Sequence, residues 1–303
     1  MSLDTLSKSR YSKLVLRPKI EVDVKILLCN DDGVHAPGIK ILYKVLSKIA
    51  DVTVVAPLEE RSATGHTLTL DSPLRVVEVE DKVYGCSGFP ADCALLGIAH
   101  IMAQDSPDLI VSGINRGANL GQDIFYSGTV AAAREACFRS IPAIAISSVV
   151  DFLTRPPKDK DDELYETAAF FVRDLIQNSV HEIISPYEIL NINVPNLNQD
   201  QIASVELTRP GIRHYSQEIM ERKDFRGREY YWIGGIYQGF QEIEGSDCLS
   251  VENKNISVSS LIFNQSTNLL QNIEFKHQEK WKAFLSKFKD WSSWQDHQFK
   301  EGL

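Results

Sequence analysis

The chain has 303 residues, enough for one large domain or two ordinary ones and too many for a small fold held together by disulfides. Hydrophobic residues make up 43% and charged residues 24%, which excludes global disorder and a fibrous repeat. The 32 basic and 41 acidic side chains give a formal net charge of -9, which repels polyanions and argues against binding to DNA or RNA polymers. A small anion can still bind where a metal ion supplies local positive charge.

Segments that would indicate export or a membrane are not found. The longest apolar run, at residues 142–150, is interrupted by Ser147 and Ser148 and is shorter than the roughly 20 residues that a membrane helix needs. The first 24 residues carry only a short apolar patch between charged residues, too little for a secretory signal. The five cysteines contain no CxxC pair, so we expect reduced, buried thiols in a cytoplasmic protein without membrane contact.

Short apolar runs alternate with helical patterns through the first two thirds of the chain. They predict strands at 24–29, 52–56, 108–111, 143–147 and 189–194, and helices at 38–50, 90–103, 127–138 and 164–176. Such strands pair in parallel, because the crossover helices cover both faces of the sheet. We therefore predict an α/β fold with a three-layer core and a mainly parallel sheet over residues 24–195.

The pattern changes after Pro195, which ends the last of these strands. Period-two stretches at 204–208, 229–233 and 256–262 lie between glycine-rich turns and predict an antiparallel, β-rich appendage over 196–263. In the polar tail at 264–303, the spacing of Trp281, Phe284, Leu285 and Phe288 predicts a terminal amphipathic helix that packs on its own domain or on another subunit. We expect this tail and the N-terminal extension at 1–23 to be surface or assembly elements.

Polar loops follow the predicted strands, where ligands of a parallel sheet collect. The first loop places Asp31 beside Asp32, and two adjacent carboxylates repel each other unless a cation or hydrogen bonds compensate them. Their oxygens suit Mg²⁺, Mn²⁺ or Ca²⁺, although the residues 30–33 also make a good tight turn. The second loop, 61–67, supplies hydroxyls and His66, which is either a candidate proton donor or a structural hydrogen-bonding residue.

The third loop, 112–121, has a glycine at every fourth position and leads to the helix predicted from Ser127. Ser127 is a good N-cap residue, so the amides and the positive end of that helix favour a phosphate group. Asn115 and Asn119 are either ligands or residues that tie the loop together.

The three loops meet at one edge of the predicted sheet, and their chemistry is complementary. Carboxylate, amide and hydroxyl oxygens bind a hard cation, and helix amides bind an anion. Hydrolysis of a phosphate ester needs this combination, because the metal activates water and neutralises charge on the phosphate oxygens. The sequence therefore predicts a metal-dependent phosphatase.

Longer motifs carry a family resemblance. These are ILLCNDDG, ERSATGH, GFPADC, SGINRGANLGQDIFYSGTVAAAREA, LNINVP, TRPGIRHY and RGREYYWIGG, which together span roughly residues 24–263. The chain resembles the survival protein E (SurE) family of 5'/3'-nucleotidases. The resemblance implies a Rossmann-like core and hydrolysis of nucleoside 5'- and 3'-monophosphates. It further implies that short-chain polyphosphate is a substrate of some members, and that homodimers or homotetramers form by exchange of a C-terminal hairpin, here sought near 209–231.

The resemblance also implies a site. One divalent ion per subunit, Mg²⁺ or Mn²⁺, would be held by Asp31, Asp32, Ser62 and Asn115. Asp31, Asp32 and Asn115 would be the catalytic residues, while Asn119, Ser127, Gly128 and Thr129 would hold the substrate phosphate and His66 is the candidate acid. The sequence leaves open whether water attacks phosphorus directly or an aspartyl-phosphate forms. Ala63 and Phe89 depart from the family pattern, which affects substrate preference but not the metal ligands.

Other classes fit less well. A dinucleotide-dependent oxidoreductase would need G-x-G-x-x-G after the first strand, and NDDGVHAPG lacks it. A non-catalytic, metal-binding signalling module of receiver type would need an acceptor aspartate where the chain has Ser112 and Gly113. Phosphatases with an Asp-x-Asp pair are excluded because Asp31 and Asp32 are contiguous. The basic and aromatic stretch at 209–232 suits subunit or mononucleotide contacts better than a nucleic-acid polymer.

Overall fold

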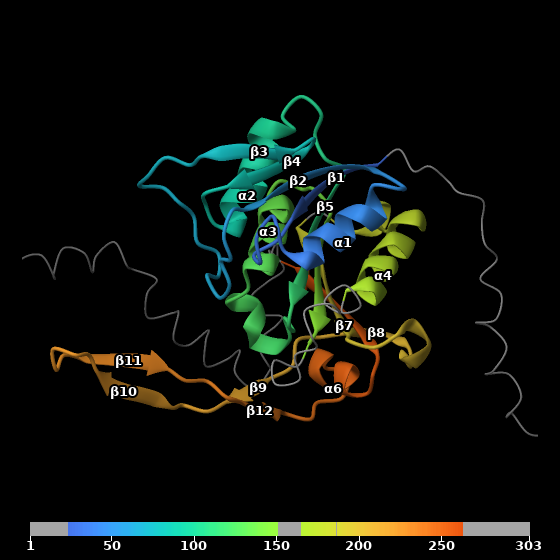
Figure 1. The fold of residues 1–303 in the computed structure, drawn as a ribbon. Coiled ribbons are helices and arrows are strands. Elements are labelled where there is room, and N and C mark those ends of the chain that lie inside the picture. The colour runs from blue at the N-terminus through green and yellow to red at the C-terminus, as the bar shows by residue number, and fades with distance from the viewer. Residues whose placement is uncertain (1–23, 151–164, 186, 263–303) are drawn as a thin grey trace, which may run out of the picture. The chain divides into compact units, whose positions relative to one another are not determined.

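The computed structural model describes residues 24–150, 165–185 and 187–262. A nine-stranded sheet lies at the centre of this part of the chain (Figure 1). In order across the sheet, the strands are β3 (Val76–Glu80), β4 (Val83–Cys86), β2 (Asp51–Pro57), β1 (Lys25–Cys29), β5 (Leu109–Arg116), β6 (Ala143–Val149), β7 (Glu188–Pro195), β13 (Ile256–Ile262) and β8 (Val205–Thr208). Neighbours from β4 to β7 pair in parallel, whereas β3 pairs antiparallel with β4 at one edge. The predicted α/β class with a mainly parallel sheet is confirmed.

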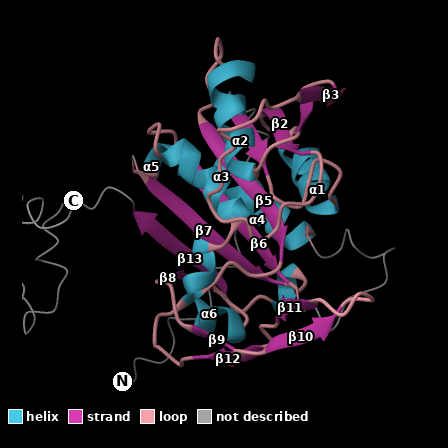
Figure 2. Ribbon diagram, turned by 90° about the vertical axis from the view of Figure 1, so that its left-hand side faces the viewer, coloured by secondary structure: helices cyan, strands magenta, loops and turns pink. Residues whose placement is uncertain are grey.

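Helices cover both faces of this sheet (Figures 1 and 2). They are α1 (Pro37–Leu46), α2 (Pro90–Leu96), η1 (Gly97–Ile101), η2 (Gly121–Phe125), α3 (Gly128–Cys137), α4 (Glu166–Gln177), α5 (Val180–Ile183), η6 (Gln199–Gln201) and α6 (Asp247–Glu252). The α-helix predicted to run to residue 103 ends earlier, because the π-helical turn η1 follows α2. The helices predicted at 38–50, 127–138 and 164–176 correspond to α1, α3 and α4, whereas the short helices η2, α5, η6 and α6 were not predicted.

Strand β1 shows how the three layers form. Its side chains alternate between the faces of the sheet, so Ile26 and Leu28 pack in one hydrophobic cluster with α1 and α4, while Leu27 and Cys29 pack in a second cluster with α2 and α3. All four side chains are fully buried. A strand that is apolar on both faces is stable only under helices on both sides, which explains the continuous apolar run in the sequence.

The sheet order brings three loops together. Strand β1 lies between β2 and β5 and runs parallel to both, with Leu28 opposite Val54 and Cys29 opposite Ser112. The loops that follow β1, β2 and β5 therefore leave the same edge of the sheet. This convergence confirms the expectation that polar residues from three parts of the sequence share one edge.

The C-terminal strands divide into two groups. Strand β10 (Ile219–Lys223) pairs antiparallel with β11 (Glu229–Ile233), and β9 (Arg213–Tyr215) pairs antiparallel with β12 (Tyr237–Phe240), as expected of the appendage. Strands β8 and β13, however, pair in parallel and belong to the central sheet. The antiparallel prediction is wrong for these two strands.

The reason for this error lies in β13. Its alternating serines resemble a solvent-facing pattern, but Ser257 and Ser259 are fully buried. Their hydroxyls lie 2.8 and 2.7 Å from Thr208 Oγ1 on β8, so short polar side chains satisfy one another inside the sheet. The domain limits at 195 and 263 stay predictions.

Three further predictions concern the two terminal segments, the cysteines and membrane-spanning helices. The N-terminal extension and the helix predicted around Trp281 lie outside the described residues. All five cysteines are buried and free of disulfides, as predicted. Within the described ranges, no helix is both long and apolar enough to cross a membrane.

Candidate active site

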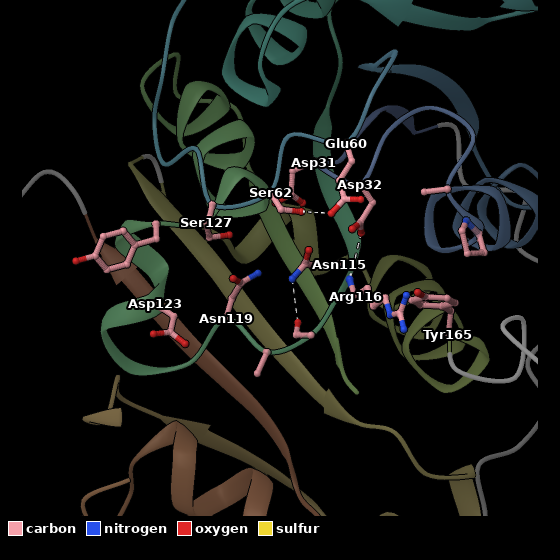
Figure 3. A pocket seen from close by; sticks show the side chains of 16 residues that line it. Asp31, Asp32, Glu60, Ser62, Asn115, Arg116, Asn119, Asp123, Ser127 and Tyr165 are labelled. Carbon is pink, nitrogen blue, oxygen red and sulfur yellow. Dashed lines mark hydrogen bonds between the residues drawn. The ribbon is translucent and has the colours of Figure 1, made fainter. Parts of the chain in front are cut away.

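A cavity of about 520 Å³ opens where β1, β2 and β5 end (Figure 3). Its lining includes Asp31, Asp32, Glu60, Ser62, Asn115, Arg116, Asn119, Asp123, Tyr126, Ser127 and Tyr165. All but Tyr165 come from the end of β5 and from the segments that follow these three strands, through the 3₁₀ helix η2 to the start of α3. The structure thus brings together the four predicted metal ligands and two of the four predicted phosphate-binding residues.

Asp31 lies directly after β1 against the first turn of α3. Only 4% of it is exposed, and the Thr129 hydroxyl donates a hydrogen bond to its Oδ1 atom. A Cβ atom at Gly128 would lie 2.7 Å from the Asp31 Cβ, so glycine is required for this approach. Burial raises the pKa of Asp31, although hydrogen bonds from Thr129 oppose that shift. The carboxylate is fixed in place but poorly compensated.

Asp32 completes the acidic pair. Its Oδ2 atom accepts a hydrogen bond of 3.2 Å from the backbone N–H of Arg116 at the end of β5. Burial, together with the negative charge of Asp31, raises the pKa of Asp32 to about 7. Two adjacent carboxylates, one buried and one half-buried, are costly as anions unless a cation compensates them, so the pair itself indicates a cation site.

Ser62 and Asn115 offer neutral oxygens beside this pair (Figure 3). The Ser62 hydroxyl donates to Glu60 Oε1 at 2.8 Å, which leaves its oxygen lone pairs available. The Asn115 Nδ2 group donates to the Gly117 carbonyl at 2.9 Å, which fixes the amide and leaves Oδ1 as its acceptor. Each of these side chains is therefore oriented by one contact and retains an oxygen for a ligand.

This donor set fits a hard divalent cation. Two carboxylates, one hydroxyl and one amide oxygen are the ligand types that Mg²⁺ and Mn²⁺ prefer. In the part of the chain that the structure describes, no three His, Cys, Asp or Glu side chains are placed to hold a metal ion. A cation shell around the two aspartates would therefore need neutral oxygens such as those of Ser62 and Asn115.

The predicted phosphate-binding residues divide in the structure. Ser127 lines the cavity and caps α3, because its Oγ atom accepts a 3.0 Å hydrogen bond from the Val130 N–H. Asn119 also lines the cavity. Gly128 and Thr129 do not line it, and Thr129 gives its only hydroxyl proton to Asp31. The expected phosphate contact of the Thr129 hydroxyl is therefore replaced by a positioning contact with Asp31.

His66 lies outside the cavity lining. Its Nε2 atom is 2.7 Å from Glu135 Oε1, its Nδ1 atom is 3.2 Å from Arg134 Nη1, and its ring stacks on Phe138. Because arginine cannot accept a hydrogen bond, Nδ1 is the acceptor and the imidazole proton is on Nε2, directed to Glu135. The structure gives His66 the structural role rather than that of a proton donor in the cavity.

Comparison with known proteins now gives the family. A family model described as survival protein SurE matches residues 26–217. The chain belongs to the SurE family. Over 238 residues it is 45% identical to the 5'-nucleotidase SurE of Geotalea uraniireducens, covering 78% of this chain and 92% of that relative.

Further relatives agree. The 5'-nucleotidase SurE of Geobacter sulfurreducens is 44% identical over 78% of this chain and 87% of its own. The crystal structure of the SurE protein from Aquifex aeolicus matches with a TM-score of 0.68 and 34% identity, covering 84% of this chain and 99% of that one. The predicted family and its Rossmann-like core are confirmed, and the receiver alternative has no support.

Several lining residues of this SurE chain were not predicted from its sequence. Glu60 and Arg116 each lie within two residues of a predicted ligand, and this closeness in the sequence was a signal for their place in the site. Asp123 is joined to the site by η2, where Arg213 and the Tyr215 hydroxyl hold its carboxylate. Tyr165, at the start of α4, comes from a distant segment, and no local pattern connects it to the site.

Proposed function

We propose that the chain is a divalent-metal-dependent phosphomonoesterase that hydrolyses nucleoside 5'- and 3'-monophosphates to nucleoside and phosphate. The pair of buried Asp31 and half-buried Asp32, beside the N-terminus of α3, carries the proposal, because it joins a cation site to an anion site. The name 5'-nucleotidase, borne by relatives over 40% identical, supports this substrate class.

The side chains of the cavity have two proposed roles, to hold the metal ion and to position its ligands. Asp31, Asp32, Ser62 and Asn115 would hold one Mg²⁺ or Mn²⁺ per subunit, which would supply positive charge and lower the pKa of a bound water. Thr129 and the Arg116 backbone position the two carboxylates, and Glu60 orients Ser62. Asp31 or Asp32 orients or deprotonates the attacking water.

The substrate phosphate is placed against Ser127 and Asn119. The Ser127 oxygen accepts from the Val130 N–H, so its own hydroxyl proton remains available for a phosphate oxygen. The positive end of the ten-residue helix α3 adds a favourable field for the anion. Protonation of the leaving group is not assigned to His66, because its proton is directed to Glu135.

Assembly and location complete the proposal. Every residue of the paired strands β10 and β11 is exposed, including Trp232 at 63% and Ile233 at 91%. A two-stranded hairpin with such apolar side chains is marginal in water, which supports its burial against another copy as a homodimer or homotetramer. We further propose short-chain polyphosphate as a second substrate and the cytoplasm as the location, with neither a nucleic-acid polymer nor a membrane as partner.

A phosphate-release panel tests the activity. Nucleoside 5'- and 3'-monophosphates, polyphosphate and an aryl phosphate are each assayed with Mg²⁺, with Mn²⁺ and with chelator. We expect metal-dependent release from the nucleotides, lost in Asp31→Asn and Asp32→Asn but kept in the exposed control Asp200→Asn. Asp32→Asn should also raise the melting temperature of the metal-free protein by a few degrees, because it removes buried repulsion. Full activity in either site variant contradicts the proposal.

A further inference from the structure

Arg116 gives the cavity one positive side chain among four carboxylates. Of the described residues that line the cavity, Arg116 is the only lysine or arginine. The carboxylates are those of Asp31, Asp32, Glu60 and Asp123. Without a metal ion, the four carboxylates outweigh the one guanidinium and repel an anionic substrate. The position of the guanidinium therefore decides where in the cavity a negative group is attracted.

Among the residues that the structure describes, the guanidinium of Arg116 has no ion pair or hydrogen-bond partner. Its Nε atom is buried without a hydrogen-bond partner, and no ion pair of this side chain is found within the described ranges. Arg61 and Arg213 also have an unpartnered buried Nε, but each pairs with a carboxylate through a terminal nitrogen. A buried donor without a partner points to a ligand that completes it.

The backbone of Arg116 is fixed at the end of β5, where the residue pairs with Ser148 of β6 and its N–H donates to Asp32. Figure 3 shows its guanidinium beside Tyr165, with Asn115 between it and Ser127 and the acidic pair above them. Ser127 and Arg116 therefore offer two separate places for negative charge at the cavity. A cavity of about 520 Å³ has room for more than one phosphate group.

We propose that Arg116 binds a second phosphate group of the substrate, so that the site favours nucleotides with two phosphates over monophosphates. The inference rests on the proposed function, since it takes the hydrolysed phosphate to lie at Ser127. A guanidinium binds phosphate through two parallel hydrogen bonds, and lysine supplies only a point charge. Arg116 is then a residue that determines specificity rather than one that acts on the reacting phosphorus.

The test compares adenosine 3',5'-bisphosphate with adenosine 5'-monophosphate in the full-length protein with Mg²⁺. Arg116→Ala should lower kcat/KM for the bisphosphate by about tenfold or more, and for the monophosphate by less than about threefold. Arg116→Lys should restore part of the difference. The control Arg173→Ala removes the same charge from α4, where Arg173 pairs with Asp174 away from the cavity lining, and should change neither substrate.

Two results overturn the proposal. An equal loss for both nucleotides assigns Arg116 to the hydrolysed phosphate, and no loss for either assigns it no phosphate at all. Calorimetric titration of both nucleotides into Asp32→Asn with Mg²⁺, a background that stops turnover and removes one repelling carboxylate, separates this inference from the proposed function. We expect this background to bind the bisphosphate more tightly than the monophosphate and the added Arg116→Ala change to remove that preference, even if neither nucleotide is a substrate of wild type. Equal binding of both nucleotides by Asp32→Asn contradicts the inference.

Discussion

The side chain of Asn193 on β7 binds both backbone groups of Asn119. The Asn119 N–H donates to Asn193 Oδ1 at 2.8 Å, and Asn193 Nδ2 donates to the Asn119 carbonyl at 3.1 Å. Asn191 Nδ2 reaches the same carbonyl at 2.9 Å, and the Asn119 side chain donates to Ser147 on β6. Side chains of β6 and β7 therefore hold Asn119, which lines the cavity. They bind its backbone N–H and carbonyl in the way that the backbone of a neighbouring strand would.

Asn193→Ala should loosen this loop. It leaves the buried N–H of Asn119 without a partner, which costs about 1–3 kcal/mol of unfolding free energy. We expect a raised KM for nucleotides, because Asn119 is displaced, with kcat less affected. Urea unfolding and steady-state kinetics measure the two effects. Asn178→Ala, which removes only a contact within α4, is the control, and a KM as low as wild type in Asn193→Ala would refute the role.

Thr129 should affect metal binding through Asp31. Thr129→Val keeps the shape of the side chain but removes the hydroxyl that orients the Asp31 carboxylate. We expect Mn²⁺ affinity, measured by calorimetry, to fall about tenfold or more, because residues that orient metal ligands have effects of this size. Thr129→Ser retains the hydroxyl and should keep near-normal affinity. Equal affinity in the valine and serine variants would show that the contact is not used.

Glu60 and Glu59 form a matched pair for a second test. Glu60 accepts the Ser62 proton and lines the cavity, whereas the neighbouring Glu59 lies 3.8 Å from Arg61 and does not line it. Glu60→Ala should weaken Mn²⁺ binding by roughly tenfold, because Ser62 loses the acceptor that orients its lone pairs. Glu59→Ala removes the same charge one residue away and should leave affinity unchanged. If both variants bind Mn²⁺ alike, the contact between Glu60 and Ser62 does not support metal binding.

Glu135 gives a prediction about pH. Burial alone would raise the pKa of Glu135, but hydrogen bonds from His66 and Arg139 lower it below the usual 4.5. A pKa lowered by folding means that the ionised group stabilises the fold above pH 4.5 and that this contribution is lost as the pH falls below it. Glu135→Gln should therefore cost about 1–3 kcal/mol near pH 7.

Unfolding of wild type and Glu135→Gln at several pH values measures this difference. It should shrink steadily as the pH falls from 5 toward the folded pKa and beyond. A difference that stays constant or grows in acid would assign the cost to packing rather than to the charge of Glu135. If Glu135→Gln has the same kinetics as wild type at neutral pH, the variant still folds.

The sequence by itself determined the layers and the edge at which the site forms. Apolar strands such as 24–29 require helices on both faces, and parallel strands direct their following loops to one edge. Asp31, Ser62 and Asn115 could therefore be placed together without coordinates. Ser127 could likewise be predicted as a helix cap, because capping depends only on residues next to it in the chain.

Only the tertiary structure decided which atoms face the cavity. A hydroxyl has one proton to donate, and whether Thr129 gives it to a phosphate or to Asp31, 98 residues away, depends on how α3 packs against β1. The same holds for His66, whose proton is directed to Glu135 on α3, and for the serines of β13, which a partner strand buries. Local sequence fixes the available donors and acceptors, whereas their partners are chosen by packing between distant segments.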